Sequence, residues 1–296
     1  MLSVLIPTYN YNVTKLVYAL HEQLMASKIA FEIIVFDDGS TSKIIEENQI
    51  LNTLNDVTYK VNPKNVGLSN NRNLLAKASS YEYILFIDGD SLVINQTYIS
   101  NYLQAITTDT AIIYGGRVHP KEVLKQRKLR WKYGTQREDL TAKQREKNPY
   151  KRMFCNNTLM TKTIFNTIGF EKTLTQYGHE DTLFAYKASL LKASVLHIDN
   201  PILHGDVDYS DVFIKKTKKG LQNLNYIYKS KLIDYQFIPF LGYFTKLKQW
   251  KLNYVLAASY YILSPLIQLN LTSNRPSLFL FDLFRISYFC HINLKT

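Results

Sequence analysis

The chain of 296 residues is 46% apolar and carries a net charge of +12. This length and composition suit one large domain, or a domain with an extension, and the sparse Gly and Pro exclude a disordered or fibrous protein. The two cysteines, Cys155 and Cys290, give neither a metal-ligand spacing nor a disulfide framework, so we expect a reducing, cytoplasmic location. Residues 1–6 are apolar with no basic stretch before them, so we expect no signal peptide.

The positive charge is concentrated in two segments. Residues 119–152 hold twelve Lys and Arg against four Asp and Glu, and residues 211–296 hold twelve against three. Basic blocks of this kind indicate contact with phosphates, acidic lipids or nucleic acid. A solubilising surface is the alternative for each block.

Strands and helices alternate along the first part of the chain. Apolar runs that end in polar turns predict strands, and apolar residues three or four positions apart predict helices. The expected strands are 2–6, 31–36, 57–61 and 83–87, and the expected helices are 13–27, about 42–54 with Thr41 and Ser42 as caps, and 67–78. This alternation predicts an α/β fold with a mostly parallel, doubly wound sheet. Such sheets bind ligands at the carboxyl ends of their strands, where the polar clusters of this sequence lie.

The basic segment 119–152 interrupts this pattern. It lacks a clear apolar face, so we expect a long mobile loop or a short helix with flexible ends. Beyond it, residues 153–160 and 195–198 are expected to be strands, and residues 182–193 a helix.

The composition changes near residue 210, which predicts a catalytic domain at 1–210 and a basic, aromatic-rich helical extension at 211–296. Residues 252–274 contain no charge and are long enough to span a bilayer. They also contain Asn, Ser, Gln and a central Pro265, so an interfacial or packed helix is favoured over a spanning one. Basic residues beside aromatic and aliphatic ones are typical of a helix on an anionic membrane surface.

Asp88-Gly89-Asp90 follows the apolar strand 83–87 directly. Two carboxylates separated by a flexible Gly can share Mg²⁺ or Mn²⁺, and such a metal commonly bridges a diphosphate. A solvated turn would use the same residues. The position at a strand end favours the metal site.

Two further motifs lie at a strand end and a helix start. Residues 37–40 (Asp-Asp-Gly-Ser) can accept a hydrogen bond from a base or ribose, or form an N-cap turn. Residues 65–69 (Asn-Val-Gly-Leu-Ser) open a helix, where Gly67 would allow close backbone approach. Arg72 would then pair with phosphate or stack on a base. A plain helix start is the alternative.

Glu180 and Asp181 directly precede the helix predicted at 182–193. Carboxylates there can favour the helix dipole, or one of them can deprotonate an attacking hydroxyl as general base. A lone His is more often structural than a ligand, but His204 becomes a candidate third metal ligand beside a carboxylate site. His197 lies within an expected strand, so we interpret it as structural.

These motifs, in this order, resemble the family 2 glycosyltransferases of the GT-A fold, and most closely the inverting galactosyl- and hexosaminyl-transferase-like members. The resemblance covers roughly residues 1–205. It is carried by residues 3–10, 37–40, 65–67 with Arg72-Asn73, 88–90 and 178–181.

The resemblance implies a role for each matching residue. Donor binding is implied for Pro7, Tyr9, Asp38, Asn65, Gly67, Arg72, Asp88 and Gly89, with the first two and Asp38 lining the base and ribose pocket. Metal binding is implied for Asp88, Asp90 and His204. Asp181 would be the catalytic base, and Glu180 would orient acceptor or donor hydroxyls.

The implied protein is a Rossmann-like nucleotide-diphospho-sugar transferase with a C-terminal helical extension. It would be an inverting glycosyltransferase that depends on Mn²⁺ or Mg²⁺ and moves a sugar from a UDP-sugar to a glycan or lipid-linked glycan, as in surface polysaccharide synthesis. The basic segment 119–152 would close over the donor and exclude water. We expect a cytoplasmic protein, peripheral at the inner face of an anionic membrane.

Three alternatives remain open from the sequence. A nucleotidyltransferase would favour a Gly-rich phosphate loop with Lys near residue 10, where this chain has Pro-Thr-Tyr-Asn. A basic module that binds nucleic acid or a membrane surface without turnover is allowed by the charge, but the basic residues avoid the strand-end motifs, so no nucleic-acid partner is expected. A degenerate transferase that only acts as a scaffold is disfavoured because all the motif acids are present.

Overall fold

The computed structural model of the chain describes residues 1–40, 43–174 and 176–295. The expected caps Thr41 and Ser42 lie outside the described residues. The chain divides into two compact units. The first contains residues 1–118, 139–175 and 180–206, and the second contains residues 119–138, 176–179 and 207–296.

Within the described residues, the first unit is built on a seven-stranded sheet in the order β3-β2-β1-β4-β8-β6-β9. The pairs β1–β2, β2–β3, β1–β4 and β6–β9 are parallel, whereas β8 runs antiparallel to both of its neighbours. The expected mostly parallel α/β sheet is therefore confirmed. The strands are β1 (Leu2–Thr8), β2 (Phe31–Asp37), β3 (Val57–Val61), β4 (Tyr83–Ile87), β6 (Ile112–Tyr114), β8 (Asn157–Thr161) and β9 (Val195–His197).

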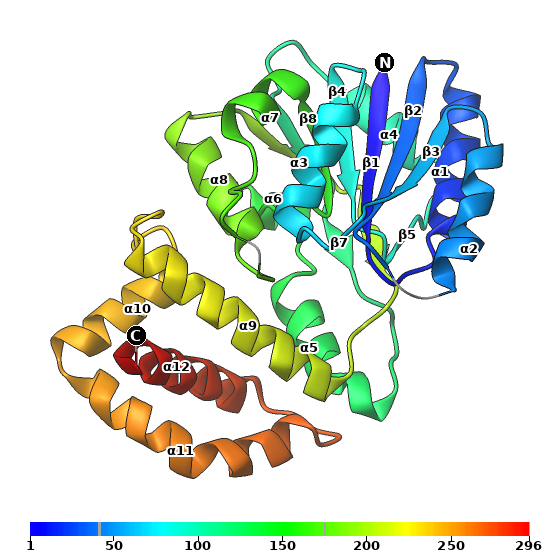
Figure 1. Cartoon of the computed structure of the whole chain (residues 1–296). Helices are drawn as coiled ribbons and strands as arrows, with labels where there is room; N and C mark the ends of the chain where they lie inside the picture. The colour runs from blue at the N-terminus through cyan, green and yellow to red at the C-terminus, as the bar shows by residue number, and fades with distance from the viewer. Residues whose placement is uncertain (41–42, 175, 296) are drawn as a thin grey trace. The chain divides into compact units, whose positions relative to one another are not determined.

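Helices cover both faces of this sheet (Figure 1). Alternate residues of β1, β2 and β4 pack against α1 (Thr14–Ser27) and α4 (Tyr98–Ala105) in one apolar core. On the other face, α3 (Leu68–Ala78) contacts β1 and β2, and Phe86 of β4 packs on Phe165 and Phe170. Strands buried on both faces must be apolar throughout, which explains their continuous hydrophobic runs.

The remaining elements of the first unit are short. The helices are α2 (Ile44–Gln49), α6 (Ala142–Arg145), α7 (Lys162–Ile168) and α8 (Glu180–Leu190), with 3-10 turns at Ile50–Thr53 and Tyr150–Arg152. A small second sheet has the order β5-β10-β7, formed by Ser91–Leu92, Ile202–His204 and Arg117–Val118.

The second unit is helical. Its helices are α5 (Lys128–Arg137), α9 (Ser210–Lys229), α10 (Pro239–Gln249), α11 (Leu252–Leu271) and α12 (Leu278–Lys295), with a 3-10 turn at Lys125–Arg127. Helix α12 contacts both α9 and α11, and the side chains of α5, α9, α11 and α12 share one apolar cluster. Figure 1 shows α12 lying between α9 and α11.

Of the two expectations for 119–152, the long mobile loop is wrong and a short helix is confirmed, because this segment contains α5, α6 and two 3-10 turns. Several of its cations are buried and bonded rather than free to close over a ligand. Arg145 donates to the carbonyl oxygen of Ile198 and to Nδ1 of His197, and Arg130 pairs with Glu138. Most of its polar residues are exposed, and the burial of Arg130 and Arg145 against partners has no signal in the sequence.

The predicted boundary at residue 210 lies close to residues 206 and 207, where the chain passes into the second unit. The second unit also includes residues 119–138. A single boundary along the sequence cannot describe a unit built from separate segments. His197 is buried, and its Nε2 lies 3.0 Å from the carbonyl oxygen of Pro149, as expected of a structural side chain.

Leu85 tests the sheet core, because it is fully buried in β4 between β1 and β8. We expect Leu85→Ala to lower the free energy of unfolding by about 3 kcal/mol, through lost burial and the cavity left behind. Urea denaturation followed by circular dichroism measures this. The exposed Leu190 is the matched control, and Leu190→Ala should cost less than about 0.5 kcal/mol. Equal losses in the two variants would contradict this account of the core.

Candidate active site

The carboxyl ends of β1 and β4 lie close together because Gly89 has no side chain. Its N–H donates to the carbonyl oxygen of Pro7, at 3.3 Å. A Cβ at position 89 would lie 3.0 Å from Cγ1 of Val13 and 3.1 Å from Oγ1 of Thr8. A larger residue would therefore push the Asp-Gly-Asp motif away from the first strand.

Asp38 follows β2 and holds the loop that precedes α3. Its carboxylate accepts hydrogen bonds from the backbone N–H groups of Val66 and Gly67, both at 2.9 Å. Gly67 caps α3 with φ of 84°, a conformation that favours glycine. Asp38 is buried with its oxygens on this loop, and its expected contact with a base or ribose stays a prediction.

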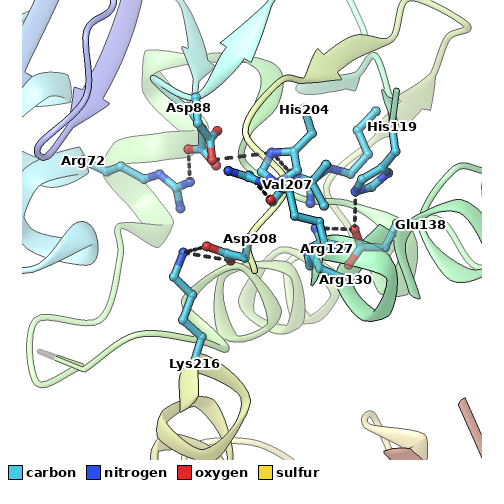
Figure 2. A network of polar contacts seen from close by, with 12 residues as sticks. Arg72, Asp88, His119, Arg127, Arg130, Glu138, His204, Val207, Asp208 and Lys216 are labelled. Carbon is cyan, nitrogen blue, oxygen red and sulfur yellow. Dashed lines mark hydrogen bonds and ion pairs between the residues drawn. The ribbon is translucent and has the colours of Figure 1, made fainter. Parts of the chain in front are cut away.

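Arg72, in the first turns of α3, is the centre of the site. Its guanidinium binds Oδ1 of Asp88 through one terminal nitrogen and Oδ1 of Asp181 through the other, each at 2.7 Å. Figure 2 shows the pair between Arg72 and Asp88 at the end of β4. The Arg72 side chain is 1% exposed, so it is not available to stack on a base. In this structure Arg72 bridges two motif acids, and its expected role as a donor ligand stays a prediction.

The carboxylates stabilise the charge of Arg72, whereas burial raises the pKa of Asp88 above its usual range although Arg72 lowers it. Burial alone would lower the pKa of Arg72, but the carboxylates of Asp181 and Asp88 outweigh that effect and raise it. Arg72 also lies over the ring of Phe170, with its guanidinium carbon 5.1 Å from the ring centroid. The two acids keep partial access to solvent, with side-chain exposures of 28% for Asp88 and 21% for Asp181. A fixed cation therefore holds two reachable carboxylates.

Cys155 lies beside these acids and is inert. Burial raises the pKa of its thiol well above the usual range, and the neighbouring Asp181 raises it further. A thiol that stays protonated can donate to Asp181 and cannot act as a nucleophile. Sequence analysis missed this contact because nothing in the spacing of the two residues indicates it.

The second half of the site is formed by the small sheet. Strand β10 pairs antiparallel with β5, which aligns His204 with Ser91, next to Asp90. Nδ1 of His204 lies 3.5 Å from Oδ2 of Asp90, and Nη2 of Arg117 lies 3.5 Å from the same His nitrogen. Figure 2 shows His204 and Asp88 in the same region of the first unit. The structure thus brings His204 to the Asp-Gly-Asp motif, although the two are far apart in sequence.

The donor set suits a divalent cation that also binds a diphosphate. In the described part of the chain, no three His, Cys, Asp or Glu side chains are grouped closely enough to hold a metal by themselves. Mg²⁺ is typically held by one or two protein carboxylates together with substrate phosphates rather than by a protein cage. Asp90 and His204 fit that arrangement better than Asp88, whose Oδ1 is already bound by Arg72.

The other expected residues lie around this centre. Pro7 is buried near the end of β1, and Tyr9, just beyond that strand, is exposed. Asn65 is exposed in the loop that Asp38 holds, and its Oδ1 accepts from the N–H of Gly67. Glu180 is buried at the start of α8.

Asn156 was missed by sequence analysis. It precedes β8, its carbonyl oxygen accepts from the N–H of Asp88, and its side chain is buried. Within the described residues, neither polar atom of that side chain has a hydrogen-bond partner, which is costly unless a ligand or water supplies one. A lone Asn before a strand carries no sequence signal for this role.

Replacing the bridging cation tests the assembly of the site. We expect Arg72→Leu to lower the free energy of unfolding by about 3–5 kcal/mol, because it leaves two acids without their buried partner. The comparison is Lys215→Leu, which removes an exposed pair with Asp211 and should cost less than about 1 kcal/mol. Urea titrations of both variants measure this. A loss for Arg72→Leu as small as that of the control would show that the bridge does not organise the site.

Comparison with known proteins agrees with this geometry. A family model described as glycosyl transferase family 2 matches residues 3–172. An uncharacterized glycosyltransferase of Rickettsia felis is 37% identical over 90 residues, which make up 30% of this chain and 15% of that protein. The poly(ribitol-phosphate) β-N-acetylglucosaminyltransferase TarS of Staphylococcus aureus is 32% identical over 98 residues, or 32% and 17% of the two chains. The matches thus span less than a fifth of either relative.

Solved structures show the same fold. The crystal structure of S. aureus TarS 1–349 has a TM-score of 0.52 at 18% identity, covering 75% of this chain and 64% of that one. The mannosyltransferase PcManGT of Pyrobaculum calidifontis has a TM-score of 0.52 at 14% identity, covering 77% and 64%. These similarities confirm the expected GT-A fold. Because the family model spans more than half of the chain, the protein belongs to glycosyl transferase family 2.

Proposed function

We propose that this chain is an inverting, metal-dependent glycosyltransferase that moves a sugar from a UDP-sugar to a hydroxyl of a glycan or lipid-linked glycan. The observation that carries the proposal is the Arg72 bridge. It holds the aspartate of the Asp-Gly-Asp motif and an aspartate at the start of α8 on one guanidinium, so two family motifs form one site. Neither the nucleotidyltransferase nor the nucleic-acid module accounts for that arrangement.

The choice of donor is supported by the solved relatives. TarS 1–349 has been crystallised with UDP and with UDP-GlcNAc, and PcManGT with GDP-Man and Mn²⁺. TarS also shares sequence with this chain, which favours uridine over guanosine. Tyr9 and the loop held by Asp38 supply the surface on which the nucleotide would lie.

The metal, Mn²⁺ or Mg²⁺, would be held by Asp90 and His204. When bound, it neutralises the diphosphate and stabilises it as a leaving group. Asp88, fixed by Arg72, would orient the donor ribose. This separates the two aspartates of the motif by function, one for the metal and one for positioning.

Asp181 is the better candidate for the base. It is partly exposed, whereas Glu180 beside it is buried, so an acceptor hydroxyl can reach Asp181 more readily. The carboxylate takes the hydroxyl proton as the acceptor oxygen bonds to the anomeric carbon and the bond to the diphosphate breaks. A single displacement from the opposite face inverts the configuration, without the covalent intermediate of a retaining enzyme. Glu180 would support the site by holding the start of α8.

The acceptor class is proposed from the relatives and from the charge of the chain. TarS is named for a poly(ribitol-phosphate) acceptor, a polyanion, and this chain carries a net charge of +12. A glycan that carries phosphate, or is attached to lipid phosphate, would be attracted by such a protein. We place the enzyme at the cytoplasmic face of the membrane, where lipid-linked intermediates are available.

Removing the base tests the mechanism. We expect Asp181→Asn to lower kcat roughly 10²- to 10⁴-fold, since the general base is lost while its amide can still accept from Arg72. Donor binding, measured by calorimetry with the UDP-sugar, should change little. Glu180→Gln should reduce kcat less than Asp181→Asn does. If Glu180→Gln is the more damaging of the two, the base is Glu180 instead.

Removing a metal ligand tests the second half of the site. We expect Asp90→Asn to raise the Mn²⁺ concentration for half-maximal transfer by roughly tenfold or more, because a hard oxygen ligand loses its charge. Asp211→Asn, at an exposed carboxylate of α9, is the control and should leave the Mn²⁺ dependence unchanged. Full transfer by the wild type in EDTA would show that no metal is needed.

A further inference from the structure

We propose that α11 docks on the surface of an anionic lipid bilayer through one exposed apolar face and lies in the plane of the membrane. This inference rests on the proposed function, because docking would bring the enzyme to the surface where it meets a lipid-linked acceptor. The docking itself is a property of the second unit and needs no donor, so it can be measured separately.

The docking face consists of six large apolar residues on one side of α11, namely Tyr254, Val255, Tyr261, Ile262, Leu266 and Leu269. They recur at intervals of three, four and seven residues, which puts them on the same side of a helix. Ile262 is 73% exposed, Leu266 65% and Leu269 70%. A contiguous apolar surface on a folded protein marks an interaction site. We call these six residues the α11 apolar face.

The opposite side of α11 is packed against other parts of the second unit. Its buried residues include Ser264, Ile267 and Leu271, and the helix packs along α12. Among the described residues α11 is the one helix long and apolar enough to cross a membrane. Only 22% of its apolar window is buried, so α11 is not the core helix of a soluble unit either.

The packing on α12 argues against a spanning helix. Asp282 of α12 pairs with Arg137 through both carboxylate oxygens, at 2.8 and 2.6 Å, and also with Arg285. If α11 crossed the bilayer, this neighbouring helix and its charges would be drawn into hydrocarbon, which is costly. A helix that lies in the interface buries only its outer face and leaves those charges in water.

The charges around the α11 apolar face favour an anionic surface. Residues 235–281 contain Lys246, Lys248, Lys251 and Arg275, but no Asp or Glu. The three lysines precede α11 and are exposed, and the arginine follows it and is exposed. Trp250, at the α10–α11 junction, is also exposed, and Trp is favoured at the boundary between water and lipid. Each basic residue near an anionic membrane adds to the binding.

The same charges disfavour a second copy of this chain as the occupant. Two α11 faces that meet in parallel would bring the lysines of both copies together. Two that meet antiparallel would place the lysines beside Arg275 of the other copy. Because residues 235–281 supply no acidic side chain, neither arrangement neutralises the cations.

Vesicle binding by the full chain tests the proposal. We expect co-sedimentation with vesicles of phosphatidylcholine and phosphatidylglycerol, and binding at least roughly tenfold weaker to phosphatidylcholine alone. In a Trp131→Phe background, the emission of Trp250 should shift to the blue on binding and be quenched by brominated lipid. No binding to either vesicle would overturn the proposal.

Matched variants assign the binding to the α11 apolar face. Ile262→Glu with Leu266→Glu should weaken binding roughly tenfold or more, because charge is placed on the surface that enters the lipid. Met25→Glu with Ile50→Glu makes the same change at exposed apolar residues of the first unit and should bind like the wild type, apart from a small effect of the added charge. Equal weakening in both double variants would show that the effect comes from net charge alone. It would overturn the assignment of binding to the α11 apolar face.

Two further outcomes would also overturn it. If bound protein resists extraction by alkaline carbonate, α11 spans the bilayer. If sedimentation without lipid shows a dimer that Ile262→Glu with Leu266→Glu converts to a monomer, the face is an interface between copies. Donor turnover by the unbound enzyme, measured with a water-soluble acceptor, is independent of all these results and tests the proposed function separately.

Discussion

One buried cation organises this protein's site. Arg72 carries a positive charge into the interior, where it would be unstable alone, and the two aspartates that stabilise it come from motifs 109 and 16 residues away. Removing Arg72 would leave both carboxylates without their cation, whereas removing one carboxylate would leave Arg72 paired with the other. The carboxyl end of β4 and the first turn of α8 are therefore held together by electrostatic attraction as well as by packing. This bridge brings a motif at a strand end and a motif at a helix start into one site.

The bridge also gives the acidic residues of the site different contacts. Asp88 is engaged by Arg72, and the small sheet brings His204 to Asp90, the second aspartate of the motif, which is why we propose the metal there. At Gly89 a Cβ would lie 3.0 Å from Cγ1 of Val13 and 3.1 Å from Oγ1 of Thr8, so a larger residue would fit beside β1 only if these neighbours shifted. Asp181 is held at one oxygen and stays partly exposed, which suits a group that must be both positioned and reachable. In the second unit, α11 turns an apolar side outward between basic residues, which is consistent with a chemistry performed at a membrane surface.

Much of the fold could be predicted from the sequence, and the contacts of the site could not. The strands 2–6, 31–36 and 83–87 were predictable because strands covered on both faces are apolar throughout, and 57–61 because buried and polar residues alternate in an edge strand. That rule also places the polar clusters at one edge of the sheet, but it does not say which atoms meet. The sequence predicts that Arg72 binds phosphate at the start of a helix. Only the packing of α3 shows that the Arg72 side chain is buried. The strands that position His204 are two or three residues long and leave no periodic pattern. The basic segment 119–152 reads as a loop because its inward arginines are satisfied by carbonyl oxygens and carboxylates far along the chain.

The central claim is that this site takes a sugar from a nucleoside diphosphate donor. The most direct test is the release of nucleoside diphosphate by the purified full chain, measured with Mn²⁺ across a set of UDP-sugars and GDP-sugars, with and without glycan acceptors. We expect UDP to be released from at least one UDP-sugar, and faster when an acceptor is present. Release from none of the donors, with or without acceptors, would contradict the account.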